Sequence, residues 1–195
     1  EASKVQFNAN VYYMLYRDQL ILTGALDDVG SPVRSNSERS YRLGLEVDAT
    51  IALSKQWIWK PNFTISQNQN IDLTNNGVAV GNTAIAYSPN LIAGSLLLFE
   101  PVKNLHLTWL SKFVGEQFMN NLERPEARLP DYFVNDFNVS YSWNPKSVFR
   151  TITVNGLVNN ILDKTYVSNG YMWDIFPYYY PQAGLNFLVG LTLQF

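Results

Sequence analysis

Apolar and polar residues alternate with a period of two along most of the chain, which is the pattern of β-strands whose two faces meet different surroundings. In the most regular run, every second residue from Tyr41 to Leu53 is apolar or aromatic. A run of this length exceeds the roughly 5–6 residues typical of soluble strands and suits a membrane strand of about 9–11 residues. The alternation predicts eight strands, at 5–15, 41–53, 57–68, 91–99, 105–113, 132–143, 151–159 and 187–195.

One predicted strand, 57–68, is less regular than the others. Pro61 lies within it and has no N–H to donate to a ladder, so this strand suits a sheet edge or a bulge. No segment shows the 3.6-residue period of an amphipathic helix. The sequence therefore predicts an all-β protein.

The connections between these strands alternate in length. Short turns are predicted at 54–56, 100–104 and 144–147, and longer polar stretches at 27–39, 69–84, 119–131 and 168–178. Short turns at one end and long loops at the other are typical of transmembrane barrels, which also have an even number of strands. The pattern favours an antiparallel up-and-down transmembrane β-barrel that occupies residues 1–195 without a break, with both termini on the short-turn side.

Composition supports a membrane setting. Charged residues make up 15% of the chain, against about 25% in soluble domains. The polar faces are built from amide and hydroxyl side chains, which suit a hydrated barrel interior. Aromatic residues gather near the short turns, where a membrane girdle would meet the interface: Trp57, Trp59, Phe99, Tyr141, Trp143 and Phe149.

Composition also excludes several functions. The chain has no cysteine, which excludes disulfides, thiolate metal sites and cysteine nucleophiles. A net charge of −2 argues against a nucleic-acid partner bound by phosphate neutralisation. A soluble β-barrel binding module stays open as an alternative, because it too alternates, but it would bury the apolar face.

Three segments of the sequence resemble conserved segments of one known receptor family. Residues 154–166, which end in NILDKTY, resemble the penultimate-strand signature N-L-F-D-K-x-Y of TonB-dependent outer-membrane receptors, with Ile161 and Leu162 in place of Leu-Phe. The run from Pro181 to Phe195 resembles the closing strand of that family. Residues 111–118, SKFVGEQF, resemble an S-K-Y-V-G-x-Q-Y segment of receptors of the Bacteroidetes type.

The resemblance implies the last eight strands of a 22-stranded barrel in the bacterial outer membrane. It implies TonB-coupled import of a scarce nutrient: siderophore-bound iron, haem, cobalamin or an oligosaccharide. The family's plug domain, which contacts TonB, has no counterpart in these residues, so we expect a processed or partial chain. Further implied partners are outer-membrane lipid and lipopolysaccharide, the outer-membrane assembly machinery and a surface lipoprotein. A small complete eight-stranded outer-membrane barrel, acting as an enzyme or an anchor, is the alternative.

Candidate catalytic or metal-binding groups are few, and no cofactor is expected. His106 lies on a polar face near a short turn, where we expect a structural role. Glu46 and Asp48 share a face beside Arg42, and a carboxylate pair serves acid–base chemistry in some enzymes, but an ion-pair network with Arg42 is favoured. Asp27-Asp28 and 75–77 offer oxygen ligands for Ca²⁺, yet solvated loops are favoured. The sequence therefore predicts no enzyme.

The loop at 171–180 is the strongest candidate for binding. Its aromatic side chains, with two arginines of another long loop, form the predicted ligand-contacting set: Tyr171, Trp173, Phe176, Tyr178, Tyr179, Arg124 and Arg128. Exposed aromatic rings stack on flat ligands, and arginine pairs with anions or lipopolysaccharide phosphate. An outer aromatic girdle that packs against other loops is the alternative for the rings, and solvated charges for the arginines.

The end of the chain predicts a second function. Phe195 follows apolar residues at every second position, among them Leu191 and Leu193. This row resembles the signal that the outer-membrane assembly machinery reads.

Overall fold

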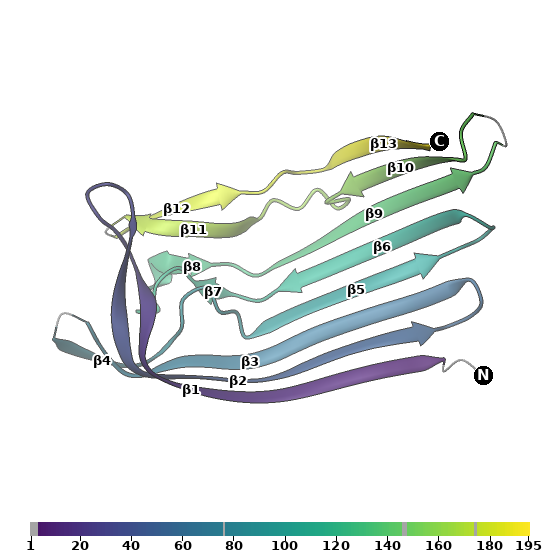
Figure 1. The fold of residues 1–195 in the computed structure, drawn as a ribbon. Helices are drawn as coiled ribbons and strands as arrows, with labels where there is room; N and C mark the ends of the chain where they lie inside the picture. The colour runs from purple at the N-terminus through teal and green to yellow at the C-terminus, as the bar shows by residue number, and fades with distance from the viewer. Residues whose placement is uncertain (1–3, 76, 146–147, 174) are drawn as a thin grey trace.

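The computed structural model describes residues 4–75, 77–145, 148–173 and 175–195. Its main sheet is antiparallel, and its strands follow the spatial order β1-β2-β3-β5-β6-β9-β10-β13, with β4 paired to β3 (Figure 1). The strands on this path are β1 (Val5–Leu26), β2 (Pro32–Ala52), β3 (Trp57–Asn75), β5 (Leu91–Phe99), β6 (Leu105–Val114), β9 (Tyr132–Trp143), β10 (Thr151–Asn159) and β13 (Asn186–Gln194). These eight strands are the eight predicted from the alternation.

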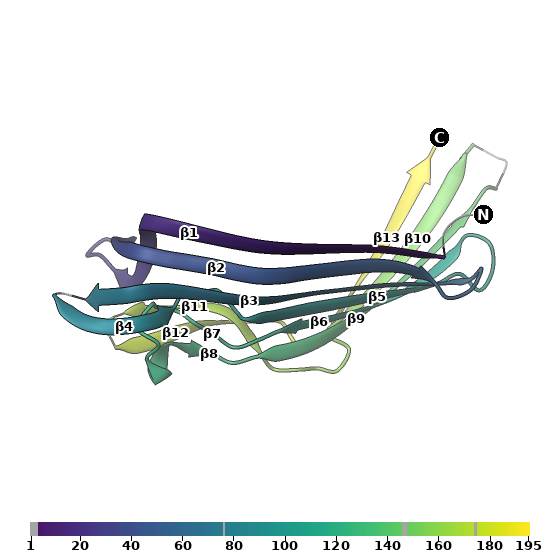
Figure 2. The same cartoon turned by 90° about the horizontal axis from the view of Figure 1, so that it is seen from below.

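The sheet is open. β1 and β13 form its two edges, and no pairing between them occurs in the described part of the chain. Figure 2 shows β10 and β13 turned away from β1 and β2, so the sheet curves without closing on itself. The alternative of a complete eight-stranded barrel is therefore wrong.

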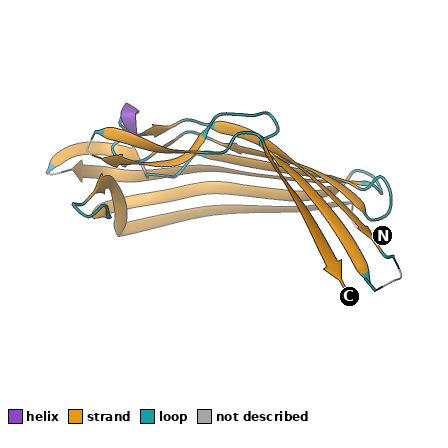
Figure 3. Ribbon diagram, turned by 90° about the horizontal axis from the view of Figure 1, so that it is seen from above, coloured by secondary structure: helices purple, strands orange, loops and turns teal. Residues whose placement is uncertain are grey.

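Smaller elements lie at the long-connection end. They are β4 (Val78–Ala84), β7 (Gln117–Phe118), β8 (Arg128–Leu129), β11 (Val167–Trp173), β12 (Phe176–Pro181) and the 3₁₀ helix η1 (Pro125–Ala127), which is the helix in Figure 3. Among the described residues, no helix has the length and apolarity needed to cross a bilayer. The predicted short turns at 54–56 and 100–104 lie at the opposite end, beside the start of β1 and the end of β13, as predicted (Figure 1). Residues 146 and 147 of the third predicted turn lie outside the described residues.

Three predicted loops are wrong in extent. The stretch 27–39 is mostly strand, because β2 begins at Pro32, and 69–84 contains the end of β3 and all of β4. The stretch 168–178 belongs to the β11–β12 hairpin. In the first two stretches polar residues led to the error: a strand that extends beyond the apolar zone can be polar on both faces and loses its period-two pattern. In 168–178 aromatic residues dominate, and they do not alternate with polar ones either.

The apolar faces of the strands point outward. Val11 on β1 and Phe187 on β13 have exposed fractions of 73% and 77%. Polar residues of the opposite face, such as Ser40, Asn68 and Asn70, are buried under the chain's own connections. A soluble β-domain has the reverse arrangement, so the soluble-module alternative is wrong and the outer face suits hydrocarbon.

Aromatic pairs lie beside the short turns. Trp57 stacks on Phe99 with ring centroids 4.0 Å apart, and Tyr141 stacks on Trp143 at 5.8 Å. The ring of Phe149 lies 5.1 Å from that of Phe195. These positions are those expected of a girdle at one membrane interface.

Pro61 lies in a central strand rather than at an edge. β3 pairs with β2 on one side and β5 on the other, and Pro61 is the register partner of Ser95 on β5. The ladder to β2 runs from Asp48–Asn62 to Ile51–Trp59 without pairs for Lys60 and Pro61. The missing N–H of proline is thus accommodated by a local gap in that ladder.

The NILDKTY segment forms the turn that follows β10. Asn160 donates from Nδ2 to the carbonyl oxygens of Lys164 (2.9 Å) and Ala183 (3.1 Å) and accepts from Lys164 N–H (2.9 Å). Asp163 accepts from Leu185 N–H at 2.8 Å. This segment therefore ties the end of β10 to the start of β13, which is a structural role for the motif.

Candidate ligand-binding site

Two hairpins from opposite parts of the sheet meet at the long-connection end. The far part of the β1–β2 hairpin turns across the sheet toward β11 and β12 (Figure 1), and β1 contacts β11. Asp18 adopts a φ of 51°, and the β1–β2 ladder has no pair at that position, between Arg17–Arg39 and Gln19–Ser37. The chain thus changes direction locally before the hairpin reaches its tip.

The tip of the β1–β2 hairpin is held by an asparagine. Asn121 Oδ1 accepts hydrogen bonds from Asn70 Nδ2 (3.2 Å) and from Ala86 N–H (2.9 Å), while Asn121 Nδ2 donates to the carbonyl oxygen of Leu22. Asn121 and Asn70 are both buried. Because buried amides are costly to leave unpaired, these bonds fix Leu22 against the segments beside it.

The β11–β12 hairpin contains the predicted aromatic residues. Tyr171 and Tyr178 are register partners, and their rings stack with centroids 5.1 Å apart and planes inclined by 9°. Gly170 is buried, and a Cβ there would lie 2.4 Å from the Tyr178 carbonyl oxygen and 2.7 Å from Met119 Sδ. Only glycine therefore fits at this close approach of β11 to its neighbours.

A small apolar cluster anchors this hairpin. Met172 packs with Met119, Ala127 and Leu129, and all four are almost completely buried. Tyr87 and Val167 pack against the same cluster. The segment 117–129 and the β11–β12 hairpin thus share one core, which is separate from the outer apolar face of the sheet.

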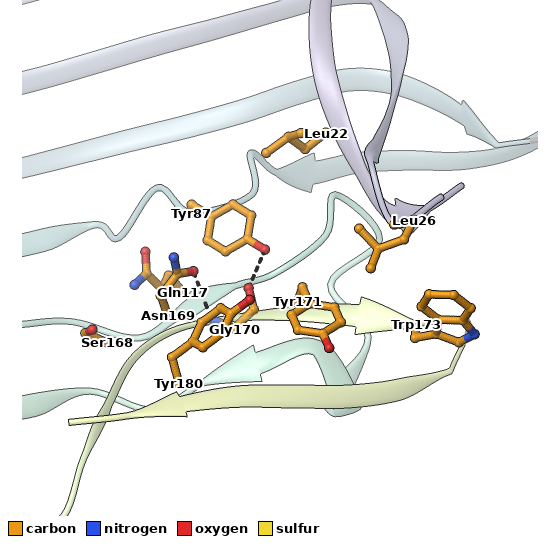
Figure 4. Close-up of a pocket in the computed structure, with 11 residues that line it drawn as sticks. Leu22, Leu26, Tyr87, Gln117, Ser168, Asn169, Gly170, Tyr171, Trp173 and Tyr180 are labelled. Carbon is orange, nitrogen blue, oxygen red and sulfur yellow. Dashed lines mark hydrogen bonds between the residues drawn. The ribbon is translucent and has the colours of Figure 1, made fainter. Parts of the chain in front are cut away.

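A pocket of about 930 Å³ lies between the two hairpins (Figure 4). Its walls come from the β1–β2 hairpin near its tip, from the connection after β4, from β7, and from both strands of the β11–β12 hairpin. The lining residues are Leu22, Leu26, Gly30, Tyr87, Gln117, Ser168, Asn169, Gly170, Tyr171, Trp173 and Tyr180. Its size falls within the roughly 300–1,000 Å³ of small-molecule sites.

Hydrogen bonds order the floor of the pocket. Tyr87 donates from its hydroxyl to the Gly170 carbonyl oxygen at 2.9 Å, and Gly170 N–H donates to Asn169 Oδ1 at 2.8 Å (Figure 4). Burial raises the pKa of the Tyr87 hydroxyl above its ordinary value of 10.0, with a smaller contribution from Tyr180. Tyr87 therefore remains a hydrogen-bond donor throughout the neutral range.

The structure brings some of the predicted ligand-contacting residues together. Tyr171 and Trp173 line the pocket, while Phe176, Tyr178 and Tyr179 are exposed elsewhere on β12. The lining residues that sequence reasoning missed come from four distant segments, as Leu22, Tyr87 and Gln117 illustrate. No local motif marks them, since only the fold places them side by side.

The two candidate arginines lie apart from this pocket. Arg128 on β8 pairs with Glu116, the residue directly before β7. Arg124 lines a separate cavity of about 380 Å³ with Asn75, Val78, Val80 and Leu122. Any anion held by these arginines would therefore bind outside the aromatic pocket.

The remaining candidates for chemistry have structural contacts. Arg42 donates hydrogen bonds to Asn68 Oδ1 (3.1 Å) and Ser88 Oγ (3.0 Å). The predicted ion-pair network of Arg42 with Glu46 and Asp48 is wrong, because no ion pair among the described residues joins them. Asn68 on β3 is the register partner of Arg42, which places its amide oxygen beside the guanidinium group. Within the described ranges no cluster of three or more His, Asp or Glu side chains could hold a metal ion.

The other two candidate groups also have local partners. His106 Nδ1 lies 4.0 Å from Glu100 Oε2 beside the β5–β6 turn. Asp27 Oδ1 accepts from the N–H groups of Val29 (3.0 Å) and Ser31 (2.7 Å), which makes it a turn residue at the β1–β2 tip. Asn76 of the other proposed calcium turn lies outside the described residues.

Comparison with known proteins finds matches among solved structures. No family model matches the sequence, and no curated protein matches it. Solved structures do match. They include the ferric yersiniabactin uptake receptor FyuA of Yersinia pestis, with 18% identity, a TM-score of 0.69 and coverage of 98% of this chain. The ferric preacinetobactin receptor BauA of Acinetobacter baumannii matches with 13% identity, a TM-score of 0.70 and 99% coverage.

A third match is the ferric-catecholate import receptor Fiu of E. coli K12, with 14% identity, a TM-score of 0.69 and 100% coverage. The chain has the fold of part of a TonB-dependent receptor barrel. It spans 27% of the length of FyuA, 26% of Fiu and 28% of BauA. Receptors of this family reside in the bacterial outer membrane and are transporters rather than enzymes.

This receptor-barrel fold accounts for the open sheet. In a bilayer, each strand edge must find hydrogen-bond partners, because hydrocarbon offers none. The sheet matches only part of the receptor barrels, and the outer edges of β1 and β13 have no strand partner among the described residues. The pocket lies at the end of the sheet that has the long connections (Figure 1).

Proposed function

We propose that this chain forms the last eight strands of an outer-membrane receptor that imports a scarce nutrient by TonB-coupled active transport. One observation carries the proposal: a pocket formed by two converging hairpins lies at the long-loop end of an open sheet whose apolar face points outward. The substrate classes under consideration are siderophore-bound iron, haem, cobalamin and oligosaccharide.

In this proposal the parts of the chain have separate tasks. The eight strands form part of the barrel wall, with hydrocarbon on the apolar side and a hydrated lumen on the amide-rich side. The β1–β2 and β11–β12 hairpins capture the substrate. Energy enters through TonB and a plug domain that lies outside these residues, so the chain itself carries no catalytic step.

The segment 111–118 supports a receptor of the Bacteroidetes type. It forms the end of β6 and all of β7, and Gly115 N–H donates to the Leu91 carbonyl oxygen at 2.8 Å. A Cβ at Gly115 would lie 3.1 Å from that oxygen, so glycine suits this close approach. The resemblance thus falls on a segment with a definite structural task rather than on a variable loop.

Two surfaces have proposed partners. Leu191 and Leu193 on the edge strand β13 and Phe195 directly after it form an exposed apolar row. We assign this row to recognition by the outer-membrane assembly machinery. Arg124 and Arg128 lie at the long-loop end, where lipopolysaccharide phosphate or a surface lipoprotein would approach. Deletion of Phe195 is expected to lower the amount of receptor in the outer membrane, and normal amounts would remove this assignment.

The transport proposal is tested in cells that carry or lack the receptor gene. Uptake of radiolabelled substrates from the four classes is measured with and without a protonophore, and in a strain without TonB. We expect one class to lose uptake on receptor deletion, on TonB deletion and on protonophore treatment alike. A receptor deletion that changes uptake of none of the four classes contradicts the proposed function.

A further inference from the structure

We propose that Arg17 on β1 and Arg39 on β2 form a site for the phosphate group of an outer-leaflet lipid; this inference rests on the proposed function, under which the long-connection end lies outside the cell. Arg17 continues the outward row of β1, in which Val11 and Leu15 have exposed fractions of 73% and 57%. Arg39 is the register partner of Arg17, and register partners share a face of the sheet. The ladder therefore brings two exposed arginines together on the surface that faces the membrane.

The height of this pair along the strand matches the edge of a bilayer. The outward residues of β1 from Val5 to Leu15 are apolar or aromatic, and Arg17 is the next outward residue. At about 3.4 Å per residue this row covers about 34 Å, or about 24–28 Å across a bilayer at a strand tilt of about 35–45°. The lipid-facing band of outer-membrane barrels is about 25 Å tall. Arg17 and Arg39 therefore fall at the level of the lipid headgroups rather than of the acyl chains.

Tyrosine side chains mark the same boundary. The rings of Tyr13 and Tyr41 lie 6.1 Å apart on the apolar side of the arginine pair. The hydroxyl of Tyr41 donates to Gln69 Oε1 at 3.0 Å. Tyrosine gathers at membrane interfaces, because its ring is apolar and its hydroxyl is polar. The sequence of tyrosine followed by arginine toward the long connections is thus that of an interface followed by a headgroup layer.

The arginine pair carries positive charge that its neighbours do not neutralise. Arg39 Nη2 lies 2.7 Å from Asp72 Oδ2, and the two side chains have exposed fractions of 56% and 71%. The side chain of Arg17 makes no ion pair or hydrogen bond with any described residue, the adjacent Asp18 included. Like charges directly opposite each other in a ladder repel. An anion between the two strands would therefore gain a free guanidinium and relieve this repulsion.

The chemistry of the pair favours a phosphorylated lipid. Guanidinium groups donate paired N–H bonds that match phosphate oxygens, and basic clusters at the membrane surface bind anionic headgroups. A lipid also places its acyl chains on the apolar outward face beside Tyr13 and Leu15, a contact that a free phosphate ion lacks. Arg124 and Arg128 differ from this pair, because they lie in the segment between β7 and β9 rather than on the outward face of the sheet.

The test uses the purified whole receptor in micelles of dodecyl maltoside, which is a neutral detergent. Three probes are titrated at a fixed detergent concentration: lipid A with its phosphates, the same lipid A after enzymatic dephosphorylation, and inorganic phosphate. Native mass spectrometry counts the bound probe. Arg17→Gln removes the free guanidinium, Asp72→Asn releases Arg39 from its ion pair, and Arg150→Gln removes an exposed arginine beside the short turns as the matched control.

We expect the wild-type receptor to bind phosphorylated lipid A at least about tenfold more tightly than the dephosphorylated form. Arg17→Gln should weaken binding of the phosphorylated form about tenfold, since one charge-assisted contact is lost. Asp72→Asn should strengthen it, because Arg39 is then shared with no carboxylate. Arg150→Gln should leave it unchanged. A purely structural role of the Arg39–Asp72 pair predicts the opposite sign for Asp72→Asn, so a folding defect cannot imitate this pattern.

The other outcomes overturn the site. Equal affinity for the two forms of lipid A, equal losses in Arg17→Gln and Arg150→Gln, or weaker binding in Asp72→Asn would each do so. Inorganic phosphate that displaces lipid A at a similar concentration would indicate a site for free phosphate and overturn the lipid assignment.

These outcomes are separate from those of the uptake test. A receptor whose deletion abolishes uptake of one substrate class, but whose lipid binding is independent of phosphate, keeps the proposed function and loses the lipid site. A receptor that shows the expected lipid binding, but whose deletion changes no uptake, keeps the site and contradicts the transport function.

Discussion

Tyr87 donates a hydrogen bond from its hydroxyl to the carbonyl oxygen of Gly170, 2.9 Å away, although the two residues are 83 positions apart in the sequence. This bond joins the connection between β4 and β5 to the first strand of the β11–β12 hairpin. Gly170 is buried, so its carbonyl has limited access to water. The bond therefore holds one wall of the pocket in place.

Replacing Tyr87 with phenylalanine should loosen the β11–β12 hairpin. The substitution keeps the ring in the apolar cluster but removes the donor, and a hydrogen bond of this kind contributes about 0.5–1.5 kcal/mol. Hydrogen exchange of the purified receptor should show faster exchange at 167–173, by up to about tenfold. Tyr141→Phe, at an exposed position on β9, serves as the control and should leave this exchange unchanged.

Alkaline pH should loosen the same contact. The folded-state pKa of Tyr87 is raised above 10.0, so its stabilising contribution is complete below pH 10.0 and is lost as the pH rises through the folded-state pKa. Tyrosinate absorbance of wild type minus Tyr87→Phe should show a titration above pH 10.0. A difference titration centred at or below 10.0 would contradict the assigned burial.

The strands could be predicted from sequence, whereas the site could not. Each of the eight strands has one face toward hydrocarbon and one toward water. Apolar and polar residues therefore alternate along the strand itself, as at Leu43, Leu45 and Val47, and the pattern can be recognised without knowledge of the fold. Beyond the apolar zone both faces of a strand are wet, and the extensions of β1, β2 and β3 carry no such pattern. The pocket joins Leu22, Tyr87 and residues of β11, and only the curvature of the sheet brings these segments together.

The aromatic residues illustrate the same limit within one hairpin. The sequence marks the whole stretch from Tyr171 to Tyr180 as aromatic, but it does not separate the pocket wall from the outer surface. Strand pairing separates Tyr179, which pairs with Gly170, from the side that Tyr171 and Trp173 share with their register partners Tyr178 and Phe176. Of the four residues on that side, Tyr171 and Trp173 line the pocket. Phe176 and Tyr179 remain outside it. Side-chain direction in a hairpin depends on register, which a stretch of aromatic residues leaves undefined.

Met172→Ala should unfold the loop core without disrupting the wall. Met172 is almost completely buried with Met119, Ala127 and Leu129, and truncation of a buried methionine costs about 2–5 kcal/mol. We expect rapid proteolysis of the 117–131 segment in intact cells and a normal amount of receptor in the membrane. Met14→Ala, at an exposed position on β1, is the matched control. Loss of the receptor from the membrane would show that the cluster is needed for barrel assembly instead.

The assignment of the two sheet faces has a direct test on neighbouring residues of β1. Val11 belongs to the outward apolar face and Asn10 to the opposite polar face. A lysine on the lipid face costs about 2–4 kcal/mol near the bilayer midplane, while a lysine facing the lumen remains hydrated. Asn10 is the register partner of Glu46 on β2, so a lysine at this position can pair with the Glu46 carboxylate.

Val11→Lys should therefore lower the midpoint of urea unfolding of the receptor in lipid vesicles and its amount in the outer membrane, whereas Asn10→Lys should change neither. Both variants introduce the same side chain one residue apart, so the change in net charge is the same in both. The reverse ranking would place the amide-rich side against hydrocarbon. It would also mean that the pocket opens away from the lumen, since the converging hairpins lie over that polar side of the sheet.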